Sequence, residues 1–168
     1  MATSTPTPPE AVASPAPRHE TLETIGALVA AVDELVGLAQ RSIRVFDVDL
    51  SDTGWNSVAR NDRLAAFLRG SRHARLDIIV HDTRYLERSC PRLRNLQRLH
   101  TGAIAIFRAG AQARAAMDPI VLVDDCHYLH RFNYERPSAA RGTQALKLRF
   151  DDIWAMREEE LPGTVLGL

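Results

Sequence analysis

Lysine is nearly absent from this sequence. Lys147 is the only lysine among 21 basic residues, and all the others are arginine. The bias is typical of a GC-rich genome, so we attach no function to it. Acidic residues also number 21, so the formal net charge is zero. A neutral chain has no bulk attraction for a polyanion, and on this ground nucleic acid is disfavoured as a partner.

Cysteine is scarce as well. Cys90 and Cys126 are the only two, and neither belongs to a Cys-x-x-Cys pair or a His/Cys cluster. This excludes the usual structural zinc patterns and predicts no metal and no cofactor. No apolar run approaches the length of a membrane span, and the N-terminus lacks the basic start and apolar centre of a secretory signal. We therefore expect a reduced, cytoplasmic protein without a membrane partner.

The first 18 residues are rich in proline, alanine and threonine. Such a segment cannot bury enough apolar surface to offset its ordering entropy, which predicts a disordered tail over residues 1–18. The remaining residues, 19–168, are enough for one domain with a substantial core.

Apolar periodicity predicts helices that alternate with short apolar strands. The predicted helices are Glu20–Gln40, 58–70, Thr83–His100 with a break at Cys90-Pro91, and Gln144–Glu160. The predicted strands are Ile43–Val48, Leu76–Val80, Ala103–Phe107, Ile120–Val123 and His127–Asn133. This order predicts an α/β fold in which parallel strands are joined by right-handed crossovers. The last two strands form a hairpin, so the result is a mixed β-sheet sandwiched between helices.

Charged residues follow the predicted parallel strands at their carboxyl ends, where open α/β sheets usually bind ligands. These residues are Asp47, Asp49, His81, Asp82 and Arg108. Acids, a histidine and an arginine on one rim could bind a phosphate, a metal or a sugar. The alternative is that polar residues gather wherever strands end in solvent-exposed loops, and Asp82 is equally suited to cap the following helix.

The segment Phe46-Asp47-Val48-Asp49 resembles the first motif of haloacid-dehalogenase-type phosphotransferases. In that family the first Asp is the nucleophile and the second is the general acid/base. The resemblance implies a metal-dependent phosphohydrolase that uses Asp47 and Asp49, with Asp124 or Asp125 as metal ligand. The family's lysine is missing before the acidic pair, because Lys147 lies after it.

The late hairpin resembles phospholipase-D-like domains, which carry His-x-Lys-x-x-x-x-Asp on a strand that precedes a turn. Aligned with this motif, Asp118 occupies the catalytic His position, Ile120 the Lys position and Asp125 the final Asp. Neither replacement can form a phosphohistidine or hold phosphate, so the resemblance implies the fold without the family's reaction. More specifically, the chain resembles an uncharacterised bacterial family of single phospholipase-D-like domains. Segments such as Ile79-Val-His-Asp and Val123-Asp-Asp-Cys-His carry this resemblance, which covers 20–168.

These observations predict a non-catalytic binding or scaffolding module, a pseudoenzyme, for an anionic or phosphate-containing ligand. The candidate ligand-binding residues are the five at the strand ends together with Asp118, His127 and Arg131. On a strand, His127 and Arg131 share a face and could bind an anion together, although a solvated sheet face has the same pattern. The expected partners are a second copy of the chain, by analogy with relatives that combine two motifs, an anionic small molecule, or a protein.

Overall fold

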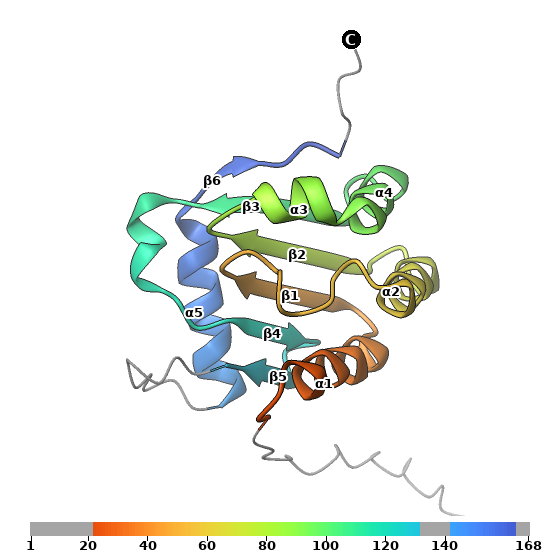
Figure 1. Cartoon of the computed structure of the whole chain (residues 1–168), viewed down its shortest axis with the longest axis horizontal. Helices are drawn as coiled ribbons and strands as arrows, with labels where there is room; N and C mark the ends of the chain where they lie inside the picture. The colour runs from red at the N-terminus through yellow and green to blue at the C-terminus, as the bar shows by residue number, and fades with distance from the viewer. Residues whose placement is uncertain (1–21, 132–141, 164–168) are drawn as a thin grey trace, which may run out of the picture.

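The computed structural model describes residues 22–131 and 142–163, within which one six-stranded sheet has helices on both faces (Figure 1). The strands are β1 (Ser42–Asp47), β2 (Arg75–Val80), β3 (Ile104–Ala109), β4 (Ile120–Val123), β5 (His127–His130) and β6 (Arg157–Glu160). The helices are α1 (Ile25–Leu38), α2 (Val58–Gly70), α3 (Arg84–Ser89), α4 (Pro91–Leu99), the short 3₁₀ turn η1 (Ala111–Ala115) and α5 (Thr143–Ala155).

The sheet combines parallel and antiparallel pairing, in the order β5-β4-β1-β2-β3-β6. Strands β1, β2 and β3 are parallel neighbours. Strand β4 lies antiparallel to β1, with Val121 opposite Val45, and β5 returns antiparallel to β4. Strand β6 closes the other edge, antiparallel to β3. The predicted mixed sheet and its late hairpin are therefore confirmed.

Two apolar clusters fill the space between the sheet and its helices. Alternate strand residues such as Val45, Ile78 and Ile106 face α1, α2, α3 and α4. Their neighbours, such as Phe46 and Ile79, face α5. In Figure 1, α5 runs behind the strands while the earlier helices lie in front and to the right. The predicted sandwich of a sheet between helices is confirmed.

Helix α1 buries one apolar stripe against the sheet, as its apolar periodicity predicts. The buried residues are Leu28, Val32 and Val36, which recur every four residues, whereas Ile25 is 57% exposed. The helix begins only at Ile25, because Thr24 accepts a hydrogen bond from the Ala27 amide and caps it. In α2 the apolar residue Val58 is also exposed, since it occupies the first turn directly after the cap Ser57.

The C-terminal helix is shorter than predicted. It ends at Ala155, and residues that were assigned to it form β6 instead. The four β6 residues are all exposed and polar, so no apolar alternation in the sequence predicts a strand there. The strand pairs closely: Gly110 donates its amide to the Met156 carbonyl at 2.9 Å, and a Cβ on Gly110 would meet that oxygen at 2.4 Å. Glycine is required here by this close approach.

The β4–β5 turn has an unusual backbone and a firm anchor. Asp124 and Asp125 both have positive φ, of 53° and 59°, as the central residues of a type I′ turn do. The Asp124 carboxylate accepts amide hydrogen bonds from Gln40, Arg41 and Ser42 at 2.7–2.8 Å. The turn is thereby tied to the segment that enters β1.

Helices α3 and α4 meet at Cys90 and Pro91, as the sequence predicted. No helix within residues 22–131 and 142–163 combines the length and apolar character needed to span a bilayer. Two predictions lie outside the described residues: the tail over residues 1–18 and the end of the second hairpin strand at Asn133.

Candidate functional site

The carboxylates that follow β1 stabilise their own loop. Asp47 is buried, and it accepts hydrogen bonds from the Val48 amide at 2.6 Å and the Thr53 hydroxyl at 3.2 Å. Burial raises the pKa of Asp47, against these hydrogen bonds, which lower it. Asp49 accepts from both the amide and the hydroxyl of Ser51. Both side chains therefore form hydrogen bonds within the loop between β1 and α2.

His81 follows β2 and is held firmly. Its Nε2 lies 2.6 Å from the Ala116 carbonyl oxygen. A carbonyl can only accept, so Nε2 carries the hydrogen and, in the neutral ring, Nδ1 is an acceptor. The ring packs edge-on against Phe46, with centroids 5.3 Å apart. The imidazole is thus fixed in one orientation at the carboxyl edge of the sheet.

Asp82 and Arg108 are engaged with neighbours of opposite charge. Asp82 accepts from both the amide and the guanidinium of Arg84, and these hydrogen bonds lower its pKa to about 2. It therefore pairs with the first residue of α3, whereas Thr83 holds the N-cap position that one alternative gave to Asp82. Arg108 lies 3.5 Å from Glu159 and 3.9 Å from Glu158 on β6. These are long contacts between largely exposed side chains, so they hold Arg108 only loosely.

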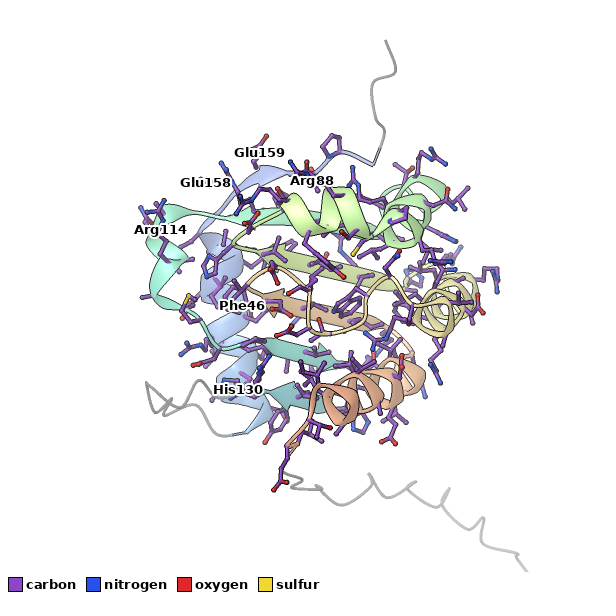
Figure 2. The ribbon with its side chains drawn as sticks, in the orientation of Figure 1. Phe46, Arg88, Arg114, His130, Glu158 and Glu159 are labelled. Atoms are coloured by element: carbon purple, nitrogen blue, oxygen red, sulfur yellow. The ribbon has the colours of Figure 1, made fainter. Side chains whose placement is uncertain are left out.

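An open cavity of about 410 Å³ lies at this edge. It is lined by Val48, His81, Arg108, Ala109, Ala111, Arg114, Met117 and Glu158. Of the eight candidates from the sequence, only His81 and Arg108 meet here. Arg114, in a polar loop without a predicted element, and Glu158, in a predicted helix, were not among the predicted site residues. Figure 2 shows Arg114 and Glu158 on the side of the molecule where η1 and β6 lie.

Asp118 belongs to a separate, buried cluster on the α5 face. It is only 5% exposed, and its Oδ2 lies 3.5 Å from Nη2 of Arg149. His130 is placed nearby, because its strand partner is Ile120. Burial lowers the pKa of His130, the Asp118 carboxylate opposes this, and Arg149 adds to it. A carboxylate with its own guanidinium partner therefore occupies the position that the hairpin alignment gave to the catalytic histidine.

His127 and Arg131 do not form a site together. His127 begins β5 and Arg131 follows its last residue, roughly 13 Å away along an extended chain. Arg131 pairs with Asp52 at 3.2 Å in the loop after β1. Leu129 lies between them and packs against the core beneath α1. At this distance one small anion cannot contact both side chains.

The acidic turn is also separated from the loop carboxylates. Strand β4 runs antiparallel to β1, so Asp124 hydrogen-bonds to Ser42 at the beginning of β1, whereas Asp47 ends that strand. The separation is roughly 16 Å along β1. Within residues 22–131 and 142–163, no group of three or more His, Cys, Asp or Glu side chains is placed to hold a metal ion. Asp47 and Asp124 are thus too far apart to hold one metal ion together.

Positive charge is concentrated in the middle of the chain. Residues 60–100 contain ten arginines and only four acidic residues, an excess of six positive charges in a chain whose net charge is zero. Arg60 and Arg63 contact Asp33, Arg75 contacts Asp77, and Arg84 contacts Asp82. The other six have no carboxylate of the described residues within ion-pair distance: Arg69, Arg72, Arg88, Arg92, Arg94 and Arg98.

Five of these arginines are exposed, and we refer to them together as the arginine surface: Arg69, Arg72, Arg88, Arg92 and Arg98. Helices α2 and α4 begin side by side, where the Arg92 amide donates to the Asn56 side chain at 3.1 Å, and they lead into the neighbouring parallel strands β2 and β3. Arg92 lies in the first turn of α4 and Arg98 in its last turn. Arg88 projects from α3 (Figure 2).

A family model matches residues 24–161, and its description is "Domain of unknown function (DUF7931)". The match covers most of the chain, so the chain belongs to this family. No curated protein matches the sequence.

Among solved structures, the chain is similar to TrmBL2, an archaeal chromatin protein whose structure shows a novel mode of DNA binding. The TM-score is 0.51 at 14% sequence identity, and the alignment covers 83% of this chain and 52% of the other. The chain thus spans about half the length of that protein. At this identity the similarity establishes a shared fold.

The expectation that nucleic acid is disfavoured as a partner is wrong. A chain with this fold occurs in a DNA-binding chromatin protein. The physical error lay in using the net charge, which is zero for the whole chain but conceals an arginine-rich segment over residues 60–100. Binding to a polyanion depends on local charge, which the sum over the chain does not report.

Proposed function

We propose that this domain of the DUF7931 family is a non-catalytic module that binds the phosphate backbone of nucleic acid through the arginine surface. The observation that carries the proposal is the set of exposed arginines on α2, α3, α4 and the loop after α2 without a carboxylate partner among the described residues. Guanidinium groups pair with phosphate through two parallel hydrogen bonds, and they are free to do so when no acid competes.

Duplex DNA fits this surface better than a single strand. Proteins that bind single strands stack bases on exposed aromatic rings. The aromatic residues of α2, α3 and α4 are Phe67, which is buried, and Tyr85, which is partly buried and packs against the core. The side chains available for contact are therefore cationic and polar, and they suit phosphates. Contacts of this kind give affinity without reading the base sequence.

The fold of TrmBL2 supports the proposal in a limited way. That protein binds DNA as a chromatin component, and this chain shares the fold of about half of it. We extend only the ligand class to this chain. The arginine surface is argued independently, from the charges and contacts of this sequence.

We further propose that the architecture is phospholipase-D-like without the phosphodiesterase reaction. The β4–β5 hairpin beside β1 supports the architecture, since it supplies the strand that carries the family's motif. The loss of the reaction is supported by Asp118, whose negative charge and Arg149 partner leave no imidazole to attack phosphorus. Ile120 stands at the position of the family's lysine, so the ammonium group that would neutralise the phosphate is missing there.

The test is fluorescence anisotropy with a labelled duplex of about 20 base pairs and with a second duplex of unrelated sequence. Wild type is expected to bind both with similar affinity at low salt. Substituting Arg69, Arg88 and Arg98 together by alanine is expected to weaken binding at least tenfold, since each phosphate contact contributes electrostatically. Alanine favours helix, so the fold is retained.

The matched control removes the same charge elsewhere: Arg108, Arg114 and Arg131 replaced by alanine. These arginines are also exposed, but they lie outside the arginine surface. Equal losses in both triple variants would show that only net charge matters, and the proposed surface would then be wrong. Absence of binding by wild type at low salt would reject the function altogether.

A further inference from the structure

We infer that the cavity at the carboxyl edge of β1, β2 and β3 binds a small ligand with a phosphate monoester, of the size of a mononucleotide. This site lies apart from the arginine surface, so the inference goes beyond the proposed function. The cavity volume of about 410 Å³ falls within the usual range of small-molecule sites. Its position, beyond the ends of three parallel strands, is where α/β sheets commonly bind ligands.

Two guanidinium groups supply the charge. Arg114, on η1, is exposed and has no carboxylate of the described residues within ion-pair distance. Arg108 approaches Glu158 and Glu159 no closer than 3.5 Å, so a phosphate oxygen can displace these contacts. A doubly charged phosphate monoester is therefore attracted more strongly than a singly charged carboxylate.

The imidazole of His81 gives the site a fixed polar group. Because Nε2–H donates to the Ala116 carbonyl and the ring packs edge-on against Phe46, the orientation is set before a ligand arrives. No described residue hydrogen-bonds to Nδ1, which is left to accept from a ligand hydroxyl or, in the protonated ring, to donate to a phosphate oxygen.

Glu158 lowers the affinity for phosphate, and it would contact the part of the ligand that carries no phosphate. Its Oε1 lies 3.4 Å from the amide nitrogen of Ala111, and its Oε2 lies 3.9 Å from Nη2 of Arg108. The close pairing of β6 with Gly110 keeps this carboxylate at the cavity wall. A carboxylate repels phosphate but accepts hydrogen bonds from hydroxyl or amino groups, such as those of a nucleoside.

The experiment is isothermal titration calorimetry on the full chain with adenosine monophosphate, adenosine and inorganic sulfate. Wild type is expected to bind the monophosphate and to bind adenosine and sulfate at least tenfold more weakly. Arg114→Ala is expected to weaken monophosphate binding about tenfold. Glu158→Gln is expected to strengthen it, because a repulsive charge is removed while the hydrogen-bonding amide remains.

Arg92→Ala is the matched control, since Arg92 is exposed but lies on the arginine surface; its monophosphate affinity is expected to equal that of wild type. No heat with adenosine monophosphate at millimolar concentration, an unchanged affinity in Arg114→Ala, or equal binding of sulfate would each overturn the inference. Duplex DNA affinity measured on Arg114→Ala is expected to be unchanged. If wild type does not bind DNA, the proposed function is rejected; if it does not bind the monophosphate, only the cavity inference is rejected.

Discussion

Asp47 and Asp124 stand at opposite ends of β1. Asp47 ends the strand and accepts from Val48 and Thr53, whereas Asp124 hydrogen-bonds to the amide of Ser42, where the strand begins. This separation removes the two-part carboxylate site that a metal-dependent phosphohydrolase needs. Each carboxylate has a structural role instead, and the two respond to pH in opposite directions.

Asp124→Asn is expected to destabilise the fold by about 1 kcal/mol at neutral pH, because a charged acceptor for three backbone amides is lost from a partly exposed site. Burial alone would raise the pKa of Asp124, but the three amides outweigh it and the pKa lies below its ordinary value. A depressed pKa gives stability that is present above the unfolded pKa and is lost as the pH falls through the folded value. Chemical denaturation at pH 7 and at pH 3 measures this.

The matched control is Asp125→Asn, which alters the neighbouring turn residue and its exposed pairs with Arg44 and Lys147. Asparagine tolerates the positive φ at both positions, so the turn is kept. A loss in Asp125→Asn as large as in Asp124→Asn would contradict the anchoring role given to Asp124.

Asp47→Asn is expected to raise the melting temperature at pH 7. Burial raises the pKa of Asp47, so ionisation of this carboxyl opposes folding. A raised pKa gives stability that is present below the unfolded pKa and is lost as the pH rises through the folded value. The difference between variant and wild type should therefore shrink toward pH 3. Thermal melts across this range check it, and a lower melting temperature at pH 7 would show that the charged form is stabilising.

Arg60→Ala is expected to cost about 3 kcal/mol of stability, whereas Arg63→Ala is expected to cost less than about 1 kcal/mol. Both arginines contact Asp33, at 2.6 and 3.2 Å, but the Arg60 side chain is fully buried over Trp55 and the Arg63 side chain is 44% exposed. Urea denaturation of the two variants compares them. Equal losses of stability in the two variants would contradict the claim that the contribution of each arginine depends on its burial.

The protein is expected not to hydrolyse phosphodiesters. Bis(p-nitrophenyl) phosphate incubated with wild type, with and without Mg²⁺, should release nitrophenol at the rate of buffer alone. Asp118 and Ile120 leave no nucleophilic imidazole or phosphate-binding cation at the motif positions. Turnover that disappears in Asp118→Asn would show that the carboxylate takes part in a reaction.

Most of the fold follows from short-range pattern. The β-branched runs at Val45 and Ile78 identified parallel strands, and Cys90-Pro91 identified the break between α3 and α4. Strand β6 was missed because Glu158, Glu159 and Glu160 lack apolar alternation, and its pairing with β3 depends on a contact across about 50 residues of sequence. Local propensity does not report such contacts.

The candidate site was predicted only in part, for the same reason. His81 and Arg108 follow strands that the sequence identifies, so their meeting at one edge was predictable. Arg114 and Glu158 reach that edge through η1 and β6, neither of which the sequence indicated. The arginine surface was visible as a count of residues, but its concentration on adjacent helices depends on tertiary packing.

The salt dependence of duplex DNA binding tests the central claim most directly. If the arginine surface contacts phosphates, log Kd of wild type plotted against log salt has a steep slope. The triple alanine variant at Arg69, Arg88 and Arg98 then has a slope smaller by about 3, one for each lost contact. A variant slope equal to that of wild type, with the slope reduced instead in the Arg108, Arg114 and Arg131 variant, would contradict it.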